Sequence, residues 1–476
     1  ALVDKYESWM DGTCVKLSDQ DDIVEFVPGK KFKFDEIKSY YKTVNIYKFG
    51  RHFSQTHYVP FLDAYSNAMG NNEYYEQVLK IITMLDDPEI KAKRLNGELW
   101  YEIDDIQDLD IATSMFMKDA DKVKALQSRY GGYWRYPKLL DFCYLVNPYF
   151  PPQKLLDEIK ASFETLVTQY PSGMKVNSLL VAKNFGVKQK NIVVGNGAAE
   201  LIKSIMTLWG GSIGIIRPTF EEYPNRYKGK QVVFTPQNAD FSYTADDIIN
   251  FYGKKDISVL ILINPDNPSG NYIPKKDVHK LAEWTASKKI KFILDESFVD
   301  FADGDDQSLI EQSFLDQHKN VMVVKSISKS YGVPGLRLGV LASGDEELID
   351  FIKKDVGIWN INSFAEFYLQ IAEKYSKDYK SALTQFKAER KRFVEKLGKI
   401  SPNLRPVSTQ ANYVMIELMG KSATELTEEL LLRDDILIKD LSGKIKSDRQ
   451  YIRVAVRNEA DNDRLITALQ RIYGGN

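Results

Sequence analysis

The chain contains Ser326-Ile-Ser-Lys-Ser-Tyr-Gly-Val-Pro-Gly-Leu-Arg-Leu-Gly339, in which Lys329 stands among hydroxyl side chains and glycines, and Arg337 follows eight residues later. A lysine can form a Schiff base with an aldehyde only when desolvation or a nearby cation keeps its amine partly unprotonated. An arginine guanidinium binds a phosphate through two parallel hydrogen bonds. This stretch therefore predicts a site for an aldehyde cofactor that carries a phosphate, with a solvated surface lysine as the alternative.

A second candidate for phosphate binding lies upstream, in Asn191-Ile-Val-Val-Gly-Asn-Gly-Ala-Ala-Glu200. The pattern indicates a strand, a glycine turn and an amphipathic helix over 201–208, whose first backbone N–H groups could hold a phosphate. The turn lacks the third glycine of a dinucleotide-binding fingerprint. An ordinary turn between a strand and a helix is the alternative interpretation.

Three side chains follow apolar, strand-like runs. Phe220 lies in the loop beyond the first run and is able to stack on a pyridine ring. Asn267 follows the run 259–263 and supplies an amide donor. Asp295 ends the run 291–295 and can keep a pyridine nitrogen protonated, which makes the ring an electron sink. Together with Lys329, these residues indicate pyridoxal 5'-phosphate.

Apolar strand-like runs alternate with helical patterns between about residues 190 and 345. This alternation is typical of a mostly parallel sheet that is covered by helices. A long helical pattern follows over 365–397, and the segments 413–417 and 451–455 are typical of strands. We therefore predict an α/β fold with a large sheet domain and a small α+β domain at the C-terminus.

The order of the motifs resembles that of the fold-type I pyridoxal-phosphate aminotransferases of class I and II. Within them it is most similar to the branch of histidinol-phosphate aminotransferase and threonine-phosphate decarboxylase, and the similarity covers roughly residues 120 to 476. The motifs are Asn196-Gly-Ala-Ala-Glu200, Pro218-Thr-Phe-Glu-Glu-Tyr223, Asn264-Pro-Asp-Asn-Pro-Ser-Gly270, Asp295-Glu-Ser-Phe298 and Ser326-Ile-Ser-Lys-Ser-Tyr-Gly-Val-Pro-Gly-Leu-Arg337.

This resemblance implies a role for each matching side chain. Lys329 would form the Schiff base and then move the Cα proton, and Asp295 would pair with the pyridinium. Asn267 would bond the phenolic oxygen of the ring, and Phe220 would stack on its face. The phosphate would be held by Ala198, Ala199, Ser326, Ser328 and Arg337.

The resemblance also implies how substrate is held. The segment Tyr451-Ile-Arg-Val-Ala-Val-Arg457 resembles the family segment whose arginine grips a substrate carboxylate. Arg453 is expected in that role, with Arg457 as a candidate for a second anion. Asn147, in a predicted N-terminal arm, is expected to face the substrate. Tyr170 resembles the tyrosine that reaches the phosphate of the partner subunit, which implies a homodimer.

Phe298 departs from the pattern of many aminotransferases, which bond the phenolic oxygen with a tyrosine at this position. Without that hydrogen bond the Schiff base should hold its proton to a higher pH. A phenylalanine here is common in the threonine-phosphate decarboxylase branch. We predict an aminotransferase acting on a small phosphorylated or phosphonate amine or amino acid. The alternatives are a threonine-phosphate-type decarboxylase and a non-catalytic pyridoxal-phosphate-binding or interaction protein.

We expect four segments along the chain. They are a partial nucleotidyltransferase-like domain (1–115), an N-terminal arm of the aminotransferase (116–165), a large cofactor-binding domain (166–375) and a small C-terminal domain (376–476). Solvent is expected to surround a charged group in the last segment, namely Asp434, Asp435, Lys439, Lys444 and Lys446.

The first 115 residues are not needed by an aminotransferase. The run Glu98-Leu-Trp-Tyr-Glu-Ile-Asp-Asp105 is expected to be a strand, on which Glu102 and Asp104 share one face and could bind a divalent cation with a nucleotide phosphate. A polar strand face is the alternative. The segment 100–112 resembles the C-terminal part of a sugar-phosphate or phosphocholine-type nucleotidyltransferase. Because the glycine-rich loop of that family does not precede it, we expect a remnant or truncated product of a fused, bifunctional nucleotidyltransferase–aminotransferase, which transfers no nucleotides by itself.

Composition favours an enzyme of small molecules. The 476 residues carry a formal charge of −2 and are 43% hydrophobic, which gives no electrostatic preference for nucleic acid or membrane. Neither a membrane-spanning run nor a signal peptide is evident. Two cysteines and four histidines without metal-binding spacing predict no structural metal. We expect a cytoplasmic enzyme with amine and keto-acid substrates.

Overall fold

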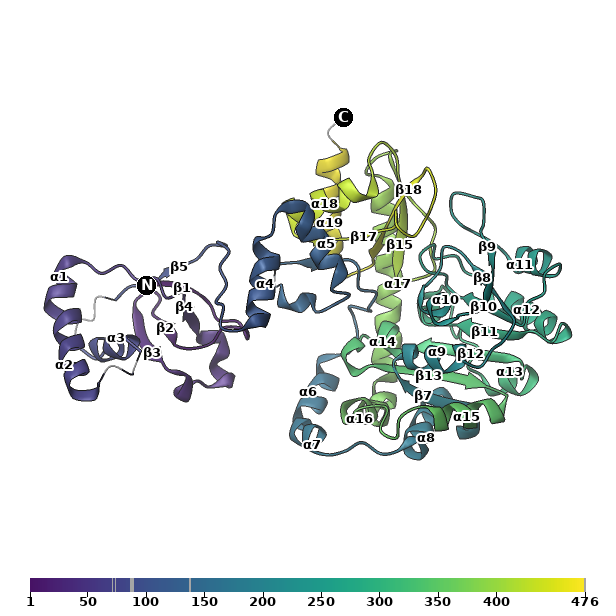
Figure 1. The fold of residues 1–476 in the computed structure, drawn as a ribbon, viewed down its shortest axis with the longest axis horizontal. Helices are drawn as coiled ribbons and strands as arrows, with labels where there is room; N and C mark the ends of the chain where they lie inside the picture. Colours follow the sequence, from purple (N-terminus) through teal and green to yellow (C-terminus); the bar gives the residue numbers. More distant parts are fainter. Residues whose placement is uncertain (71, 73, 86–89, 137, 475–476) are drawn as a thin grey trace. The chain divides into compact units, whose positions relative to one another are not determined.

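The computed structural model describes residues 1–70, 72, 74–85, 90–136 and 138–474. Its contacts divide the chain into two compact units, Ala1–Arg135 and Tyr136–Asn476, which Figure 1 shows as a ribbon. The division falls later than the predicted boundary at 115. The reason is that α4 (Ile106–Phe116) packs against α5 (Asp119–Ser128), so both helices belong to the first unit.

The first unit is built on a five-stranded sheet with the order β3-β2-β4-β1-β5. Its strands are β1 (Leu2–Lys5), β2 (Cys14–Leu17), β3 (Ile23–Val27), β4 (Tyr41–Thr43) and β5 (Lys93–Arg94). All the pairings are antiparallel except that of β1 with β5. Apolar side chains of the sheet and of α3 (Glu76–Ile82) form the core, next to α1 (Arg51–Phe53) and α2 (Val59–Met69).

The predicted strand over 98–105 is wrong, because this segment has no regular strand and runs into a helix. The carboxylate of Asp105 accepts hydrogen bonds from the backbone N–H groups of Gln107 and Asp108, at 2.7 and 3.0 Å. The Asp108 carboxylate accepts one in return from the N–H of Asp105 at 3.2 Å. This capping box begins α4, so the aspartates start a helix instead of lining a strand.

The second unit contains a seven-stranded sheet with the order β7-β13-β12-β11-β10-β8-β9. Only β13 runs antiparallel to its neighbours, which confirms the predicted α/β fold with a mostly parallel sheet. The strands are β7 (Ile192–Asn196), β8 (Ser212–Ile216), β9 (Lys230–Phe234), β10 (Val259–Ile263), β11 (Lys291–Asp295), β12 (Val321–Ser326) and β13 (Leu338–Ser343).

Helices accompany this sheet, because parallel strands need crossovers between them. They are α6 (Gln153–Ala161), α7 (Phe163–Thr168), α8 (Met174–Phe185), α9 (Ala198–Met206), α10 (Glu222–Arg226), α11 (Ala245–Tyr252), α12 (Lys275–Ser287), α13 (Gln312–Gln317), α14 (Ile327–Ser330), α15 (Glu346–Asp355) and α16 (Ser363–Ile371). The register places Ile263 of β10 beside Asp295 of β11, so the ends of these two buried strands meet at one edge of the sheet.

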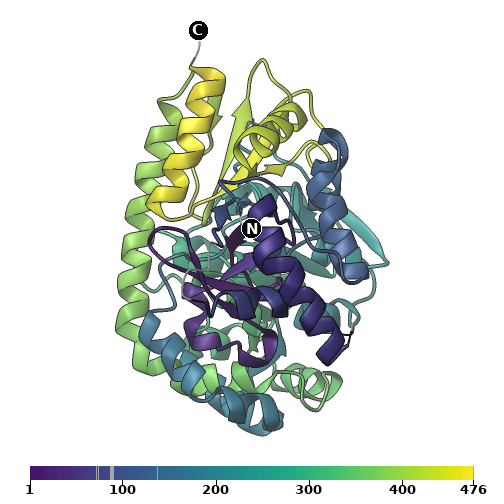
Figure 2. The same cartoon turned by 90° about the vertical axis from the view of Figure 1, so that its left-hand side faces the viewer.

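The C-terminal part carries a four-stranded antiparallel sheet with the order β14-β15-β18-β17. Its strands are β14 (Leu404–Pro406), β15 (Tyr413–Leu418), β17 (Lys439–Asp440) and β18 (Gln450–Ala455). Close by, β6 (Leu140–Asp141) pairs in parallel with β16 (Ile436–Leu437). The helices are α17 (Ser376–Gly398), α18 (Ala423–Asp434) and α19 (Glu459–Tyr473), and Figure 2 shows α17 and α19 side by side.

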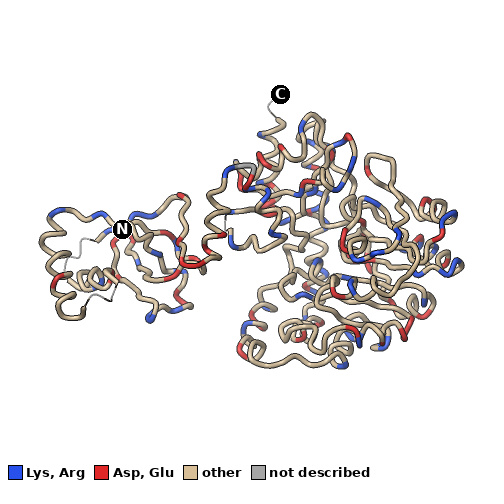
Figure 3. The backbone as a smooth tube through the Cα atoms, in the orientation of Figure 1, with Lys and Arg blue, Asp and Glu red and all other residues tan. Residues whose placement is uncertain are grey.

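Charge is mixed along the chain, with basic and acidic residues interspersed along the backbone of each unit (Figure 3). Within the described residues, no helix has the length and apolar character that crossing a bilayer requires.

Candidate active site

Lys329 lies in α14, directly after the buried strand β12. Burial and the nearby cations Arg453 and Arg337 lower the pKa of Lys329 to about 8, while the Asp295 carboxylate acts in the opposite direction. An amine with this pKa is partly unprotonated near neutral pH. The candidate Schiff-base lysine therefore has the electrostatic surroundings that its chemistry requires.

Asp295 ends β11 and is 3% exposed. Its Oδ2 accepts a hydrogen bond from the Tyr223 hydroxyl at 2.8 Å, and its Oδ1 accepts one from the backbone N–H of Ser297 at 2.9 Å. Burial raises the pKa of Asp295, and the bonds from Ser297 and Tyr223 oppose that rise. Tyr223 was given no role from the sequence, although it closes the motif that contains Phe220.

A close approach of two backbones forms a cradle at the start of α9. Gly197 has a φ of +72°, and a Cβ there would lie 2.6 Å from Nη2 of Arg337. A Cβ on Gly339 would lie 2.3 Å from the backbone nitrogen of Ala198. The Arg337 guanidinium therefore lies beside the first turn of α9, where the N–H groups of Ala198 and Ala199 are the first of the helix. A guanidinium beside a helix N-terminus suits a phosphate.

Two serines flank the start of α14. The Oγ of Ser328 is buried and has no hydrogen-bond partner among the described residues. Buried hydroxyls are almost always paired, so this atom calls for an acceptor such as a phosphate oxygen. Ser326 precedes the helix as its N-cap, without a capping bond from its side chain. The cradle at Arg337, the unpaired Ser328 hydroxyl and the Lys329 amine with its lowered pKa together fit an aldehyde cofactor that carries a phosphate.

Arg453, on β18, is 9% exposed and points at the turn after β10. Its Nη1 donates to Oδ1 of Asn267 at 2.7 Å, and its Nη2 donates to the carbonyl of Cys143 at 3.3 Å. The Asn267 oxygen is thereby occupied, which leaves its Nδ2 as the donor for a ligand. In the described part of the chain no carboxylate lies within 4.0 Å of the Arg453 guanidinium nitrogens.

Two lysines add positive charge near Arg453. Lys439 of β17 lies directly opposite Arg453 of β18 in the antiparallel ladder. Burial and Arg453 lower the pKa of Lys444 to about 8, and its side chain is half-buried instead of fully solvated. Neither lysine has a carboxylate within 4.0 Å among the residues described. Like charges opposite each other in a ladder are unfavourable unless an anion lies between them.

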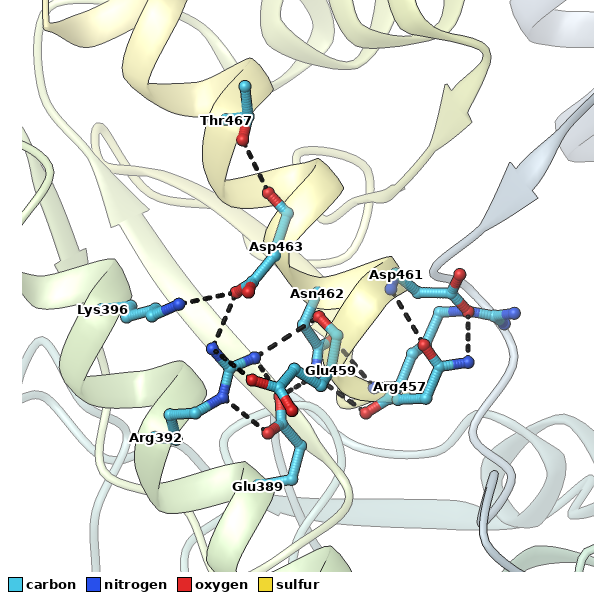
Figure 4. A network of polar contacts seen from close by, with 10 residues as sticks. Glu389, Arg392, Lys396, Arg457, Glu459, Asp461, Asn462, Asp463 and Thr467 are labelled. Carbon is cyan, nitrogen blue, oxygen red and sulfur yellow. Dashed lines mark hydrogen bonds and ion pairs between the residues drawn. The ribbon is translucent and has the colours of Figure 1, made fainter.

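Two predicted substrate contacts are occupied within the protein. Arg457 donates from Nε to Oδ2 of Asp461 and from Nη1 to the carbonyl of Asp141, both at 2.8 Å. Figure 4 shows it at the start of α19, in a network that also includes Arg392 of α17. Asn147 donates a hydrogen bond from Nδ2 to the carbonyl of Ser330 at 2.9 Å. The structure thus gives Arg457 and Asn147 partners that a substrate anion would have to replace.

Three predicted aromatic contacts lie in different environments. Phe220 is 39% exposed in its loop. Phe298 is buried, and its ring stands perpendicular to that of Tyr413 with 5.2 Å between the centroids. Tyr170 is 80% exposed and stacks on Trp359 with 4.5 Å between the centroids.

The candidate metal ligands lie in the first unit. Oε1 of Glu102 accepts from Nδ2 of Asn45 at 3.1 Å, and its carboxylate pairs with the buried Lys42 at 3.4 Å. Asp104 lies in the irregular segment that leads to α4. Over the described ranges, no three His, Cys, Asp or Glu side chains gather as metal ligands would.

The lysine, the aspartate and the phosphate cradle define a pyridoxal-phosphate enzyme of fold type I. The chain belongs to the class I and II aminotransferase family, whose model matches residues 143–469. Its cofactor is pyridoxal 5'-phosphate, which supplies an aldehyde for the lysine and an electron-withdrawing ring that stabilises negative charge at the substrate Cα.

Known proteins that are similar to this chain include enzymes whose names contain a phosphonate or a phosphorylated compound. The CMP-5'-(3-aminopropyl)phosphonate synthase of Streptomyces rubellomurinus is 31% identical over 91% of this chain and 69% of its own length. The L-serine phosphate decarboxylase of Sulfurospirillum multivorans is 33% identical over 70% of this chain and 88% of its own. The structure of histidinol-phosphate aminotransferase from Clostridium acetobutylicum covers 71% of this chain and 100% of its own, with 29% identity and a TM-score of 0.64.

Proposed function

We propose that the chain decarboxylates a small amino acid that carries a second anionic group, a phosphate or a phosphonate. The observation that carries this proposal is the group of cations formed by Arg453, Lys439 and Lys444, of which Arg453 also lowers the pKa of Lys329. A substrate with one carboxylate would leave part of this charge unmatched. Two relatives support the choice, because their names contain a phosphorylated amino acid in one case and an aminophosphonate in the other.

In this proposal each side chain has a defined task. The cations hold the second anion, so that the bond from Cα to the carboxylate stands perpendicular to the cofactor ring. Asp295 keeps the pyridine nitrogen protonated. Lys329 then delivers a proton from Nζ to Cα after carbon dioxide has left. Phe298 in place of a tyrosine also supports the decarboxylase branch.

Transamination, which the sequence analysis placed first, is the second candidate. It is supported by the description of the family model and by the similarity to a histidinol-phosphate aminotransferase. In that reaction Lys329 would remove a proton from Cα and return it to the cofactor. The two reactions use the same residues and differ in which bond at Cα the cations hold perpendicular to the ring.

The test separates the two reactions by their products. The full chain, loaded with pyridoxal 5'-phosphate, is incubated with O-phosphoserine, O-phosphothreonine or unphosphorylated serine, with and without 2-oxoglutarate. We expect carbon dioxide and a phosphorylated amine in equal amounts, without need for the keto acid, and at least about tenfold slower turnover of serine. A keto product that forms only with 2-oxoglutarate, without carbon dioxide, would establish the transaminase.

We also propose that the enzyme acts as a homodimer in which Tyr170 reaches the partner's phosphate site. Exposed apolar side chains near Tyr170 in the sequence support an interface, namely Leu156, Phe163, Val167, Val176 and Leu179. Sedimentation of the full chain tests this, and a monomer that is fully active would contradict it.

We propose that the first unit is part of a nucleotidyltransferase-like domain. The similarity to the phosphonate synthase supports this, because it extends over 91% of the chain and so beyond the aminotransferase part. Glu102 and Asp104 remain candidate ligands there for a cation with a nucleotide phosphate. Binding of CTP with Mg²⁺ to this chain tests the proposal, and its absence would contradict it.

A further inference from the structure

Asp300 lies in the short helix η6 (Val299–Phe301), and its carboxylate has three partners. Lys325 donates from Nζ to Oδ1 at 2.6 Å. The hydroxyls of Ser330 and Tyr379 both donate to Oδ2, at 2.6 and 2.9 Å. The side chains of Lys325 and Asp300 are 3% and 15% exposed, so this is a buried ion pair with two further hydrogen bonds.

The three partners belong to three elements, two of which are directly connected to the candidate catalytic lysine, Lys329. Ser330 follows Lys329 in α14, and Lys325 is in β12, which leads into that helix. Tyr379 is in α17, which continues to the small C-terminal domain and packs against β14 there. One carboxylate oxygen is therefore shared by the lysine helix and by the helix that joins the two domains.

The helix α14 depends on its neighbours, since four residues cannot form a stable helix alone. On the side of the N-terminal arm, Asn147 donates from its backbone N–H to the carbonyl of Lys329 and from Nδ2 to that of Ser330, both at 2.9 Å. The Asp300 carboxylate accepts a hydrogen bond from the Ser330 hydroxyl and so holds the side chain of this helix residue. The hydroxyls of Ser330 and Tyr379 meet on the Asp300 carboxylate and so link this helix to α17, and the ring of Tyr331, directly after the helix, also stacks on that of Tyr379 with 4.1 Å between the centroids.

The carboxylate stays ionised and can accept both hydroxyl bonds. Burial would raise the pKa of Asp300, but the Lys325 ammonium and the hydrogen bonds from Lys325, Ser330 and Tyr379 hold it below its ordinary value. Glu296, a second buried carboxyl near Lys325, accepts instead from the Ser308 hydroxyl at 2.6 Å.

We propose that Asp300 is a positioning residue for Lys329, which it holds through Ser330 and ties to the small domain through Tyr379. The inference rests on Lys329 as the Schiff-base lysine and is independent of the choice between decarboxylation and transamination. Reacting groups must be placed closely, since a displacement of about 1 Å can cost about a hundredfold in rate. Loosening α14 would move the Lys329 amine relative to Arg453 and Arg337 and admit water around it.

The test removes both hydroxyls without changing charge, in the double variant Ser330→Ala/Tyr379→Phe. The matched control is Tyr375→Phe, because the Tyr375 hydroxyl also bonds a carboxylate, that of Glu158 at 2.6 Å, without contacting α14. The pKa of Lys329 is measured in the cofactor-free protein by acetylation with acetic anhydride across pH and mass spectrometry of its peptide. We expect it to rise by about one unit in the double variant and to stay unchanged in the control.

Steady-state kinetics of the reconstituted protein give a second readout. We expect kcat of the double variant to fall about tenfold with KM within about twofold, because the amine is misplaced while the substrate-binding cations remain. A lowered unfolding temperature with an unchanged Lys329 midpoint and unchanged kcat would reduce Asp300 to a structural role and overturn the proposal.

A further variant, Asp300→Asn/Lys325→Met, removes the ion pair as a unit and avoids a lone buried charge. It should also raise the pKa of Lys329, measured as the midpoint of its acetylation profile across pH. An unchanged midpoint would again overturn the proposal. If the midpoints shift as expected while the wild type turns over no phosphorylated amino acid, the proposed function fails and the inference about Asp300 stands.

Discussion

The regions around Lys325 and Lys329 have opposite electrostatic characters, although these lysines are four residues apart. Lys325 forms an ion pair with Asp300 at 2.6 Å. Burial acts to lower the pKa of Lys325, but Asp300 keeps it above its ordinary value. Lys329 has no carboxylate within 4.0 Å among the described residues, and the cations Arg453 and Arg337 lie near it.

The difference shows that burial alone does not identify a reactive lysine. Both side chains leave water, which disfavours the charged form of each. A close carboxylate more than offsets this at Lys325, so that lysine is a structural cation. At Lys329 the neighbouring cations add to the effect of burial, so the amine is partly neutral near neutral pH, as the proposed Schiff-base chemistry requires.

Replacing Lys329 should produce the largest effect on activity. Lys329→Ala removes the only amine that we place at the cofactor aldehyde, and turnover of every amine should fall by more than about a thousandfold. Product formation by the reconstituted protein measures this, with the unfolding temperature as a check on the fold. A variant that retains a tenth of wild-type activity would remove Lys329 from the mechanism.

Replacing Lys325 should instead produce the largest effect on stability. Lys325→Met leaves the Asp300 carboxylate buried without its counterion, and we expect the free energy of unfolding to fall by about 3–5 kcal/mol. The shift of the urea unfolding transition of the cofactor-free chain measures this loss. A loss below about 1 kcal/mol would mean that water or a rearranged side chain compensates Asp300.

Replacing Arg453 tests the cations on the Lys329 side. Arg453→Gln removes a charge-assisted contact to the substrate anion, so KM for a phosphorylated amino acid should rise about 10- to 100-fold. The pKa of Lys329 should also rise, because one cation that lowers it is gone. Kinetics and the acetylation profile of Lys329 measure the two effects. An unchanged KM would place the substrate anion elsewhere.

The smallest expected effect is a gain in the free energy of unfolding, whereas Lys325→Met should lower that free energy. Because the folded pKa of Lys329 is lowered, protonated Lys329 disfavours folding below about pH 8, and stability should rise from pH 8 towards the ordinary lysine pKa. Lys329→Met should therefore stabilise the cofactor-free chain by about 1 kcal/mol at pH 7 and remove this pH dependence. Urea unfolding at pH 7 and pH 9.5 measures both. Destabilisation at pH 7 would show that Lys329 has a favourable partner.

Much of the candidate site could be predicted from local sequence, because its residues follow buried strands. Asn267 and Asp295 end or follow apolar runs, and the ends of parallel strands meet at one edge of a sheet. Arg337 and Gly197 could be predicted as neighbours only through the family resemblance. In the structure, β7 and β13 bring them together.

The failed expectations have physical reasons of their own. The segment 98–105 alternates like a strand, but the Asp105 capping box begins a helix at its end. Lys444 belongs to a stretch with several charged residues, yet Leu441 and Ile445 on either side of it are part of a buried apolar cluster. The partner of Arg457 was visible in the sequence, since Asp461 follows it at the i,i+4 spacing of a helix start.

The sequence by itself determined the fold class and the cofactor, because strand periodicity, glycine turns and a lysine among hydroxyls are local patterns that persist in the folded chain. Only the tertiary structure decided which charged groups are paired. Lys325 forms an ion pair with Asp300, whereas Arg457 donates a hydrogen bond to the Asp141 carbonyl and Arg453 to the Asn267 amide oxygen. Most of these partners are remote along the chain. The charge that remains unpaired around Lys329 is therefore a property of packing, because ion pairing depends on distance in space and not on distance in sequence.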